Sequence, residues 1–420
     1  MSTNKTHIHW FGNDLRFTDQ PFAVRANECE TIIGIYVLDP KRIEYNEWGF
    51  RNMSLNRLQS LREHLINLEK NLGGLGIHLL VKYGSPSEII PEYVKEHSAS
   101  LSFMNEYATD ERKEQQLVLE KLRGEEIYNY DGNFLFDPVN IDWQDNFAHS
   151  FSKFRKKAER YLRNKQYDLH SDLKSFGEEI RPTLKKSQRS IDNKTALPFR
   201  GGEEEGENRL NDYLFETNNA SRYKETRNGL LGKDYSTKFS YWLSVGALSP
   251  NMIMRKLKDY EQSECSNKST YWIFFELLWR DWFRHACKFY EDQFFFKSGT
   301  SEEIWTSRDS EIAFEEWAQG NTRKDFVNAN MKELRATGFM SNRGRQNVAS
   351  YLVHDQDQDW RKGAAWFENQ LVDYDVYSNI GNWQYVTGTA FNPKGGAKFN
   401  IDFQSERYDN KEKYRNHWLK

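Results

Sequence analysis

The chain has 420 residues, with 59 Lys and Arg against 62 Asp and Glu and a formal net charge of −3. That length suits two domains that each bury a core, and the balanced charge leaves any DNA contact to a local basic patch. The three cysteines, Cys29, Cys265 and Cys287, form no zinc or iron–sulfur motif, so we predict no metal site and a reducing, cytoplasmic location. No apolar run approaches the roughly 18 residues of a membrane span. The few polar residues before Ile8 leave no room for a signal peptide.

The first 135 residues alternate between strand and helix patterns. Short apolar or β-branched runs bounded by turn residues predict five strands, at His7–Phe11, Ile32–Leu38, Ile77–Tyr83, Leu101–Met104 and Glu126–Tyr130. Leucines spaced by three or four residues predict a helix from Leu58 to Leu72, and Ser85-Pro86-Ser87-Glu88 predicts a second helix that opens with a capping box. This alternation predicts an α/β domain with a doubly wound parallel sheet over residues 1–140.

The composition changes near residue 145. Residues 152–194 are polar and basic, with Lys153, Arg155, Lys156 and Lys157 close together, and predict an interdomain connector over residues 141–205 that is part helix and part loop. Helical patterns follow, and Thr270–Phe296 is apolar on almost every side, as expected for a buried helix. We therefore predict an all-α domain over residues 206–420.

Two motifs of this helical region place charged side chains where they could bind a ligand, one beside hydroxyl groups and one on an apolar helix. Tyr235–Ser240 places hydroxyls and Lys238 ahead of a predicted helix over Tyr241–Leu248, which would form an anion site, although an ordinary serine cap is the alternative. Glu276 and Arg280 stand four residues apart on the apolar helix. They either pair with each other as a structural ion pair or serve a ligand.

Two later motifs are Asn342-Arg343-Gly344-Arg345 and the stretch from Asp373-Tyr374-Asp375 to Tyr385. Each alone fits a solvated loop or a helix end. It is their occurrence in this order, after the two motifs above, that indicates a shared function.

Five further segments resemble the DASH-type members of the cryptochrome/photolyase family. They are Trp10–Arg16 (with Gly12 in place of the usual Arg), Phe154–Lys157, Phe199–Glu203, Tyr223–Gly229 and Asn330–Leu334. The resemblance covers essentially the whole chain, although residues 320–328 and 387–400 depart from the family pattern. It implies an α/β N-terminal domain and an all-α C-terminal domain that binds FAD.

The resemblance also implies roles for individual residues. A U-folded FAD would be held by Tyr223, Ser236, Thr237, Lys238, Phe239, Ser240, Arg280, Asn342, Arg345, Asp373, Asp375 and Asn382, with Asn379 facing flavin N5. An Asn at that position favours the fully reduced flavin as the working form. Trp383, Trp360 and Trp305 would relay electrons to the flavin. The spacing from Trp305 to Trp317 is two residues longer than is usual in the family, so the outer member of the relay stays open.

A DNA pocket beside the flavin is implied as well. It would be lined by Glu276, Trp279, Asn342, Arg343, Gln346 and Tyr385, with Arg227 on the DNA backbone. Glu111 matches a position that binds a folate antenna, methenyltetrahydrofolate, in relatives; a surface residue at a helix start is the alternative.

The activity implied is light-driven repair of cyclobutane pyrimidine dimers in single-stranded or bubble DNA, by electron transfer from reduced flavin to a flipped-out dimer. The alternative is a blue-light photoreceptor with regulatory DNA or partner binding and little repair. In either case we expect a monomer with no membrane partner. A plain flavin oxidoreductase is a third reading, which the lack of a nicotinamide-binding fingerprint disfavours.

Overall fold

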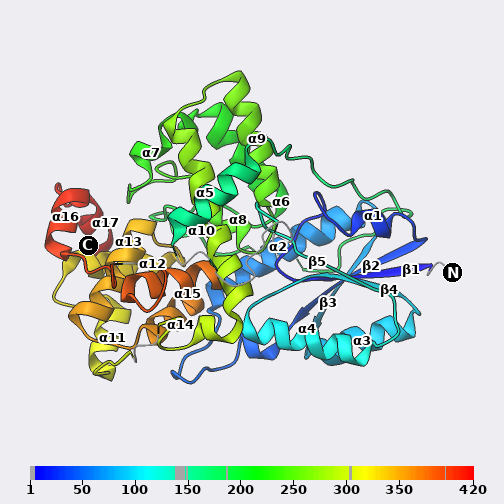
Figure 1. The fold of residues 1–420 in the computed structure, drawn as a ribbon, viewed down its shortest axis with the longest axis horizontal. Coiled ribbons are helices and arrows are strands. Elements are labelled where there is room, and N and C mark those ends of the chain that lie inside the picture. The colour runs from blue at the N-terminus through cyan, green and yellow to red at the C-terminus, as the bar shows by residue number, and fades with distance from the viewer. Residues whose placement is uncertain (1–4, 138–146, 148–149, 186–187, 302–304, 393) are drawn as a thin grey trace.

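A computed structural model describes residues 5–137, 147, 150–185, 188–301, 305–392 and 394–420. Its N-terminal domain is built on a parallel sheet of five strands in the order β3-β2-β1-β4-β5 (Figure 1). The strands are β1 (Thr6–Phe11), β2 (Thr31–Leu38), β3 (His78–Tyr83), β4 (Ser100–Met104) and β5 (Ile127–Tyr130). Each predicted strand agrees with the observed one to within a residue at either end, so the predicted doubly wound sheet is confirmed.

Helices cover both faces of this sheet. The apolar faces of α1 (Ala23–Ala26) and α2 (Leu55–Gly73) share one core with the sheet, and those of α3 (Pro86–Glu96) and α4 (Thr109–Lys121) share another. Ser85 precedes α3 as predicted, but the predicted capping box is wrong. The Ser85 hydroxyl lies 2.9 Å from the Ser87 hydroxyl and 3.3 Å from Glu114 of α4, because α4 packs beside this end of α3.

The strand order places a crevice at the carboxyl ends of β1 and β4. β2 and β3 lie on one side of β1, and β4 and β5 lie on the other, so the chain connections diverge between β1 and β4. In open α/β sheets this is where ligands bind. Here the helical domain covers the crevice: Leu15 N–H, shortly after β1, donates to Val245 O at 2.9 Å, and Arg16 donates to Gly246 O at 3.0 Å.

Helices account for the rest of the described fold. The connector contains α5 (Phe151–Leu162) and then an extended loop that runs along the sheet domain (Figure 1). The helices that follow are α6 (Glu203–Asn211), α7 (Tyr223–Thr226), α8 (Ser240–Leu243), α9 (Pro250–Ser263), α10 (Lys268–Tyr290), α11 (Glu311–Gln319), α12 (Asp325–Thr337), α13 (Asn342–Ser350), α14 (Trp360–Gln370), α15 (Val376–Thr387), α16 (Ile401–Asp409) and α17 (Lys413–Leu419).

Helix α10 runs through the middle of this domain. Asn267 caps it by accepting from the backbone of Ser269 at 2.7 Å and Thr270 at 3.2 Å. Its apolar residues belong to one core, whereas α11 to α15 build a second core around Trp317, Trp360 and Trp383. Within the described ranges, no helix is both long enough and apolar enough to cross a membrane.

Candidate functional site

A cavity of about 550 Å³ opens in the helical domain among α10, α13, α15 and the loop that precedes α8. All thirteen residues predicted to hold the cofactor line it, including Asn379 and Asn382 of α15. Glu276, Trp279, Gln346, Tyr385 and Arg227 line the same space. The four motifs, separated by more than a hundred residues in the sequence, therefore meet around one cavity.

The loop before α8 places a buried lysine in this cavity. Lys238 takes a left-handed backbone conformation, with φ of 63°, and its ammonium group donates to Ser236 Oγ at 3.0 Å. Burial lowers the pKa of Lys238 well below its ordinary value, against the opposing charge of Glu333. The predicted helix over Tyr241–Leu248 is wrong, because α8 ends at Leu243. An anion here would therefore rely on Lys238 and on hydroxyls rather than on a helix dipole.

Asp373 and Asp375 occupy the turn between α14 and α15. Asp373 is buried and accepts from Arg345 through both carboxylate oxygens, at 2.8 Å each, and from Ser240 Oγ at 2.8 Å. Asp375 caps α15 by accepting from Ser378 N–H at 2.8 Å. These bonds fix α8, α13 and α15 relative to one another on one side of the cavity.

Glu276 and Arg280 do not pair with each other, so the structural ion pair considered from the sequence is wrong. Arg227 forms an ion pair with Glu276, with Nη1 2.6 Å from Oε1. Arg280 donates instead to Asn133 O at 2.6 Å. Burial raises the pKa of Glu276 and the charge of Arg227 opposes that rise. Glu276 is thus a half-buried carboxyl at the cavity rather than an inert partner of its own helix.

Aromatic and amide side chains stand around Glu276. Trp279 and Tyr385 meet edge to face with ring centroids 5.9 Å apart, and Gln346 lines the cavity beside them. Asn379 donates to Ala364 O at 3.1 Å. Of the predicted DNA residues, Arg343 does not line the cavity. It donates to Asn228 at 2.8 Å.

Several cavity atoms fit a bound polar ligand. Within the part of the chain that is described, four buried atoms of lining residues have no hydrogen-bond partner: Tyr235 Oη, Arg280 Nε, Gln346 Oε1 and Trp383 Nε1. An unpaired buried polar group is destabilising, so such atoms mark places for ligand contacts. Cations and hydroxyls along one side and aromatic rings along another fit FAD, which has a diphosphate and a flat ring system.

The three predicted relay tryptophans differ in position. Trp383 lines the cavity and is buried, Trp360 is fully buried at the start of α14, and Trp305 is partly exposed. Gly363, one turn after Trp360, lies against the Trp383 indole, and a side chain there would collide with it. Trp383 therefore packs directly against α14, the helix that begins at Trp360, and the electron relay stays a prediction.

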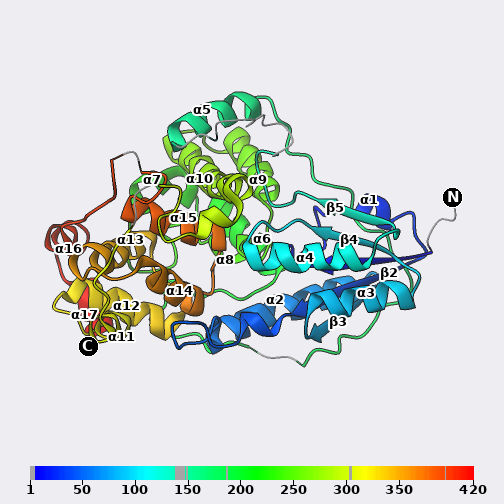
Figure 2. The same ribbon diagram turned by 60° about the horizontal axis from the view of Figure 1, so that its bottom comes forward.

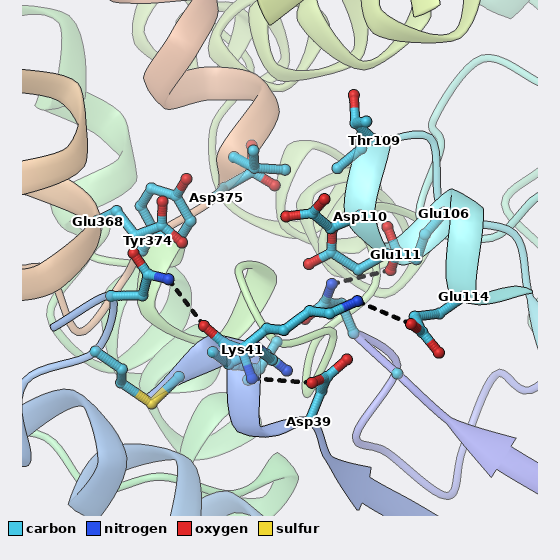
Figure 3. A pocket seen from close by; sticks show the side chains of 18 of the residues that line it. Asp39, Lys41, Glu106, Thr109, Asp110, Glu111, Glu114, Glu368, Tyr374 and Asp375 are labelled. Carbon is cyan, nitrogen blue, oxygen red and sulfur yellow. Dashed lines mark hydrogen bonds and ion pairs between the residues drawn. The ribbon is translucent and has the colours of Figure 1, made fainter. Parts of the chain in front are cut away.

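A second cavity, of about 580 Å³, lies between the two domains at the crevice of the sheet (Figure 3). Glu111 stands in the first turn of α4, at a helix start as the alternative has it, and its partly exposed side chain lines this cavity. Burial raises the pKa of Glu111 to about 7. Ser244, Tyr374 and Asp375 line both cavities, so only one layer of side chains separates them.

Sequence reasoning missed part of both sites. Trp272, Phe275 and Phe339 line the helical-domain cavity without having been predicted. Tyr235, which also lines it, belonged to the predicted anion-site segment Tyr235–Ser240 but not to the residues predicted to hold FAD. The others required the packing of α10 against its neighbours.

Known proteins match both halves of this architecture. Residues 7–172 match the family described as DNA photolyase, and residues 272–420 match the FAD binding domain of DNA photolyase. The chain belongs to the cryptochrome/photolyase family of flavoproteins.

The relatives it matches carry a more specific name. It is 37% identical over 431 residues to Cryptochrome DASH of Synechocystis sp., covering 99% of this chain and 87% of that protein. It is 36% identical to Cryptochrome DASH of Danio rerio, covering 100% and 84%. A solved Synechocystis cryptochrome superposes with a TM-score of 0.90, covering 99% of this chain and 88% of the other.

Proposed function

We propose that the protein repairs cyclobutane pyrimidine dimers in single-stranded DNA, using blue light absorbed by FAD in the helical-domain cavity. One observation carries the proposal: Glu276, Gln346, Trp279 and Tyr385 line the same cavity as the residues that fit FAD. A flipped-out dimer held by those four side chains would lie beside the cofactor. When bound, the reduced flavin supplies the electron that splits the dimer and regains it afterwards.

The chain's own residues would hold both molecules. Lys238 and the hydroxyls of Ser236 and Ser240 suit the FAD diphosphate and ribityl chain, while Asp373 fixes Arg345 against the rings. Glu276 would face a pyrimidine carbonyl of the dimer, and because burial raises its pKa, the environment favours the protonated form that can donate a hydrogen bond there. Arg227 would then turn from Glu276 toward the DNA backbone.

The preference for single strands follows from the size of the pocket. Base–aromatic stacking contributes roughly 1–3 kcal/mol per base, and Tyr385 offers less ring surface than an indole would. Extruding a dimer from duplex DNA costs a few kcal/mol, and least when the strand is already unpaired. A pocket that stacks weakly on the dimer would therefore lose activity on duplex DNA before it loses activity on single strands.

Two further roles belong to the same proposal. A folate antenna at Glu111 would occupy the interdomain cavity and pass excitation energy to the flavin. Trp383 and Trp360 would deliver electrons that reduce an oxidised flavin. The name Cryptochrome DASH of the matched relatives favours one alternative function, a blue-light photoreceptor with regulatory output.

The deciding experiment is blue-light repair of one thymine dimer in matched single-stranded and double-stranded oligonucleotides at one salt concentration. We expect efficient repair of the single strand, poor repair of the duplex and no repair in the dark. Equal rates on both substrates would refute the role given to Tyr385. Purified, flavin-loaded protein that repairs neither would favour the photoreceptor.

A further inference from the structure

Helix α5 carries a continuous cationic face. Phe151, Phe154, Ala158 and Leu162 are buried against the helical domain, and the opposite side is exposed to solvent. Helical periodicity places one set of exposed side chains on a single stripe of that side. All of them are basic: Lys153, Lys156, Lys157, Arg160 and Arg163.

The one carboxylate of α5 does not pair with Lys153, Lys156 or Arg160. The acid of α5, Glu159, points to the flank, where it accepts from the Tyr271 hydroxyl at 2.6 Å and pairs with Arg155 at 3.6 Å. Among the residues whose placement is described, no carboxylate forms an ion pair with Lys153, Lys156 or Arg160. The net charge of the chain is −3, so this concentration of positive charge is local.

A run of arginine and aromatic side chains joins α5 to the helical-domain cavity. The Arg227 guanidinium lies over the Trp272 ring at 4.3 Å, and Trp272 contacts Phe275 with centroids 4.4 Å apart. Arg155 of α5 lies over the same Phe275 ring at 5.7 Å.

The packing of α5 continues the same connection. Phe151 at its start stacks on Trp279 with centroids 3.9 Å apart. Trp272, Phe275 and Trp279 all line the cavity and are only half-buried, so α5 lies one layer of side chains from it. Figures 1 and 2 both place α5 alongside α10.

We propose that α5 binds the phosphates of the DNA strand that flanks the dimer, so that the nucleic-acid site extends from the cavity along this helix. The inference rests on the proposed function for its substrate. Alternating cations and aromatic faces suit single-stranded nucleic acid, whose bases stack while its phosphates meet charge. Lys153 and Arg160 stand about 10 Å apart at 1.5 Å rise per residue, enough to follow more than one phosphate.

The test compares K153Q/K156Q/R160Q with a control, K5Q/K95Q/R123Q, which removes three exposed cations from the sheet domain. The probe is undamaged single-stranded oligothymidine, long enough to run from the cavity past α5, with affinity measured across a salt series. Each lost phosphate contact lowers the slope of log K against log salt by about 0.7, so we expect a fall of up to about 2 in the α5 variant. The control should keep the wild-type slope.

A second readout separates this inference from the proposed function. Both variants should keep their FAD and their melting temperature, and both should repair a dimer in a dinucleotide, which is too short to reach α5, at the wild-type rate. An α5 variant with the wild-type salt slope overturns the inference even if repair proceeds. Wild-type protein that repairs nothing overturns the proposed function, while a reduced slope in the α5 variant would still support the binding surface.

Discussion

The two cavities of this molecule are nearly equal in size and opposite in charge. The helical-domain cavity, about 550 Å³, is lined by four Lys and Arg side chains and three carboxylates among the described residues. The interdomain cavity, about 580 Å³, is lined by four cations and eight carboxylates. Figure 3 shows the carboxylates of Glu106, Asp110, Glu111 and Glu114 gathered around its α4 side.

This difference indicates which ligand each cavity accepts. A diphosphate is favoured beside Lys238 and is repelled by a wall of carboxylates. The acidic wall suits a ligand that donates hydrogen bonds. Burial and the neighbouring carboxylates also favour the protonated form of these side chains, as the raised pKa values of Glu111 and Glu368 indicate. Volume alone would not distinguish the two sites.

The largest expected effect concerns the aromatic side of the helical-domain cavity. Trp383→Phe should abolish or greatly slow photoreduction of bound FAD in the presence of an external reductant, because it removes the cavity-lining indole predicted as the inner member of the relay. FAD should stay bound. Trp282→Phe, a fully buried tryptophan that does not line this cavity, is the control. Steady illumination followed by absorbance tests both, and normal photoreduction in Trp383→Phe would remove the relay.

The next largest effect concerns the cationic side of the helical-domain cavity, where Asp373 pairs with Arg345. Asp373→Asn leaves Arg345 without its two-oxygen partner, and loss of one member of a buried pair costs about 2–3 kcal/mol after allowance for the partial exposure of Arg345. We expect purified protein with little flavin and lower stability to urea. The control, Asp402→Asn, removes an exposed partner of Lys324 and should change neither quantity. Full flavin content in Asp373→Asn would show that this pair does not hold the site.

The buried carboxyl of Glu333 should make the free energy of unfolding depend on pH. Burial raises the pKa of Glu333 to about 8, although Tyr414, Lys238 and Arg345 oppose the rise. The pKa of Glu333 is higher in the folded protein than its ordinary value of 4.5. The contribution of Glu333 to folding stability is therefore fully present below 4.5 and is lost as the pH rises through about 8. The loss is at most about 1.4 kcal/mol per pH unit.

Urea unfolding of wild type and Glu333→Gln at a series of pH values measures this loss. The difference in unfolding free energy between the two proteins should change steadily from pH 5 to about 8 and then level off. A difference that is constant over this range would mean that Glu333 is already ionised in the folded protein.

The smallest effect belongs to the interdomain cavity. Glu111→Ala should weaken methenyltetrahydrofolate binding by about tenfold, since one hydrogen bond to a charged or partly charged group contributes about 1.5 kcal/mol. Binding by wild type should change with pH near 7, where Glu111 titrates. Titration followed by absorbance measures both, and flavin content should not change. A variant that loses FAD along with the folate would mean that the two cavities are one functional unit.

The sequence predicted the fold well where local patterns decide it. All five strands were found because buried parallel strands are short runs of apolar and β-branched residues between turns. The predicted helix Tyr241–Leu248 failed because α8 stops at Leu243, where the chain turns through Gly246 to contact the sheet domain. That contact is made across the domains and leaves no local pattern.

The site was predicted less evenly. Motif order brought the cofactor residues to one cavity, yet Glu276 pairs with Arg227, which lies 49 positions earlier. Helical spacing could suggest only Arg280. The interdomain cavity escaped prediction almost entirely, because β1, α4, the end of α14 and the start of α15 build it together and each looks ordinary alone.

The central claim is that charge assigns FAD to the helical-domain cavity alone. The direct measurement is the number of FAD molecules released per chain on denaturation, in wild type, Asp373→Asn and Glu111→Ala after reconstitution with excess FAD. The account predicts one FAD in wild type and in Glu111→Ala, and little in Asp373→Asn. Colourless wild-type protein that cannot be reconstituted, or FAD lost from Glu111→Ala and kept by Asp373→Asn, would contradict it.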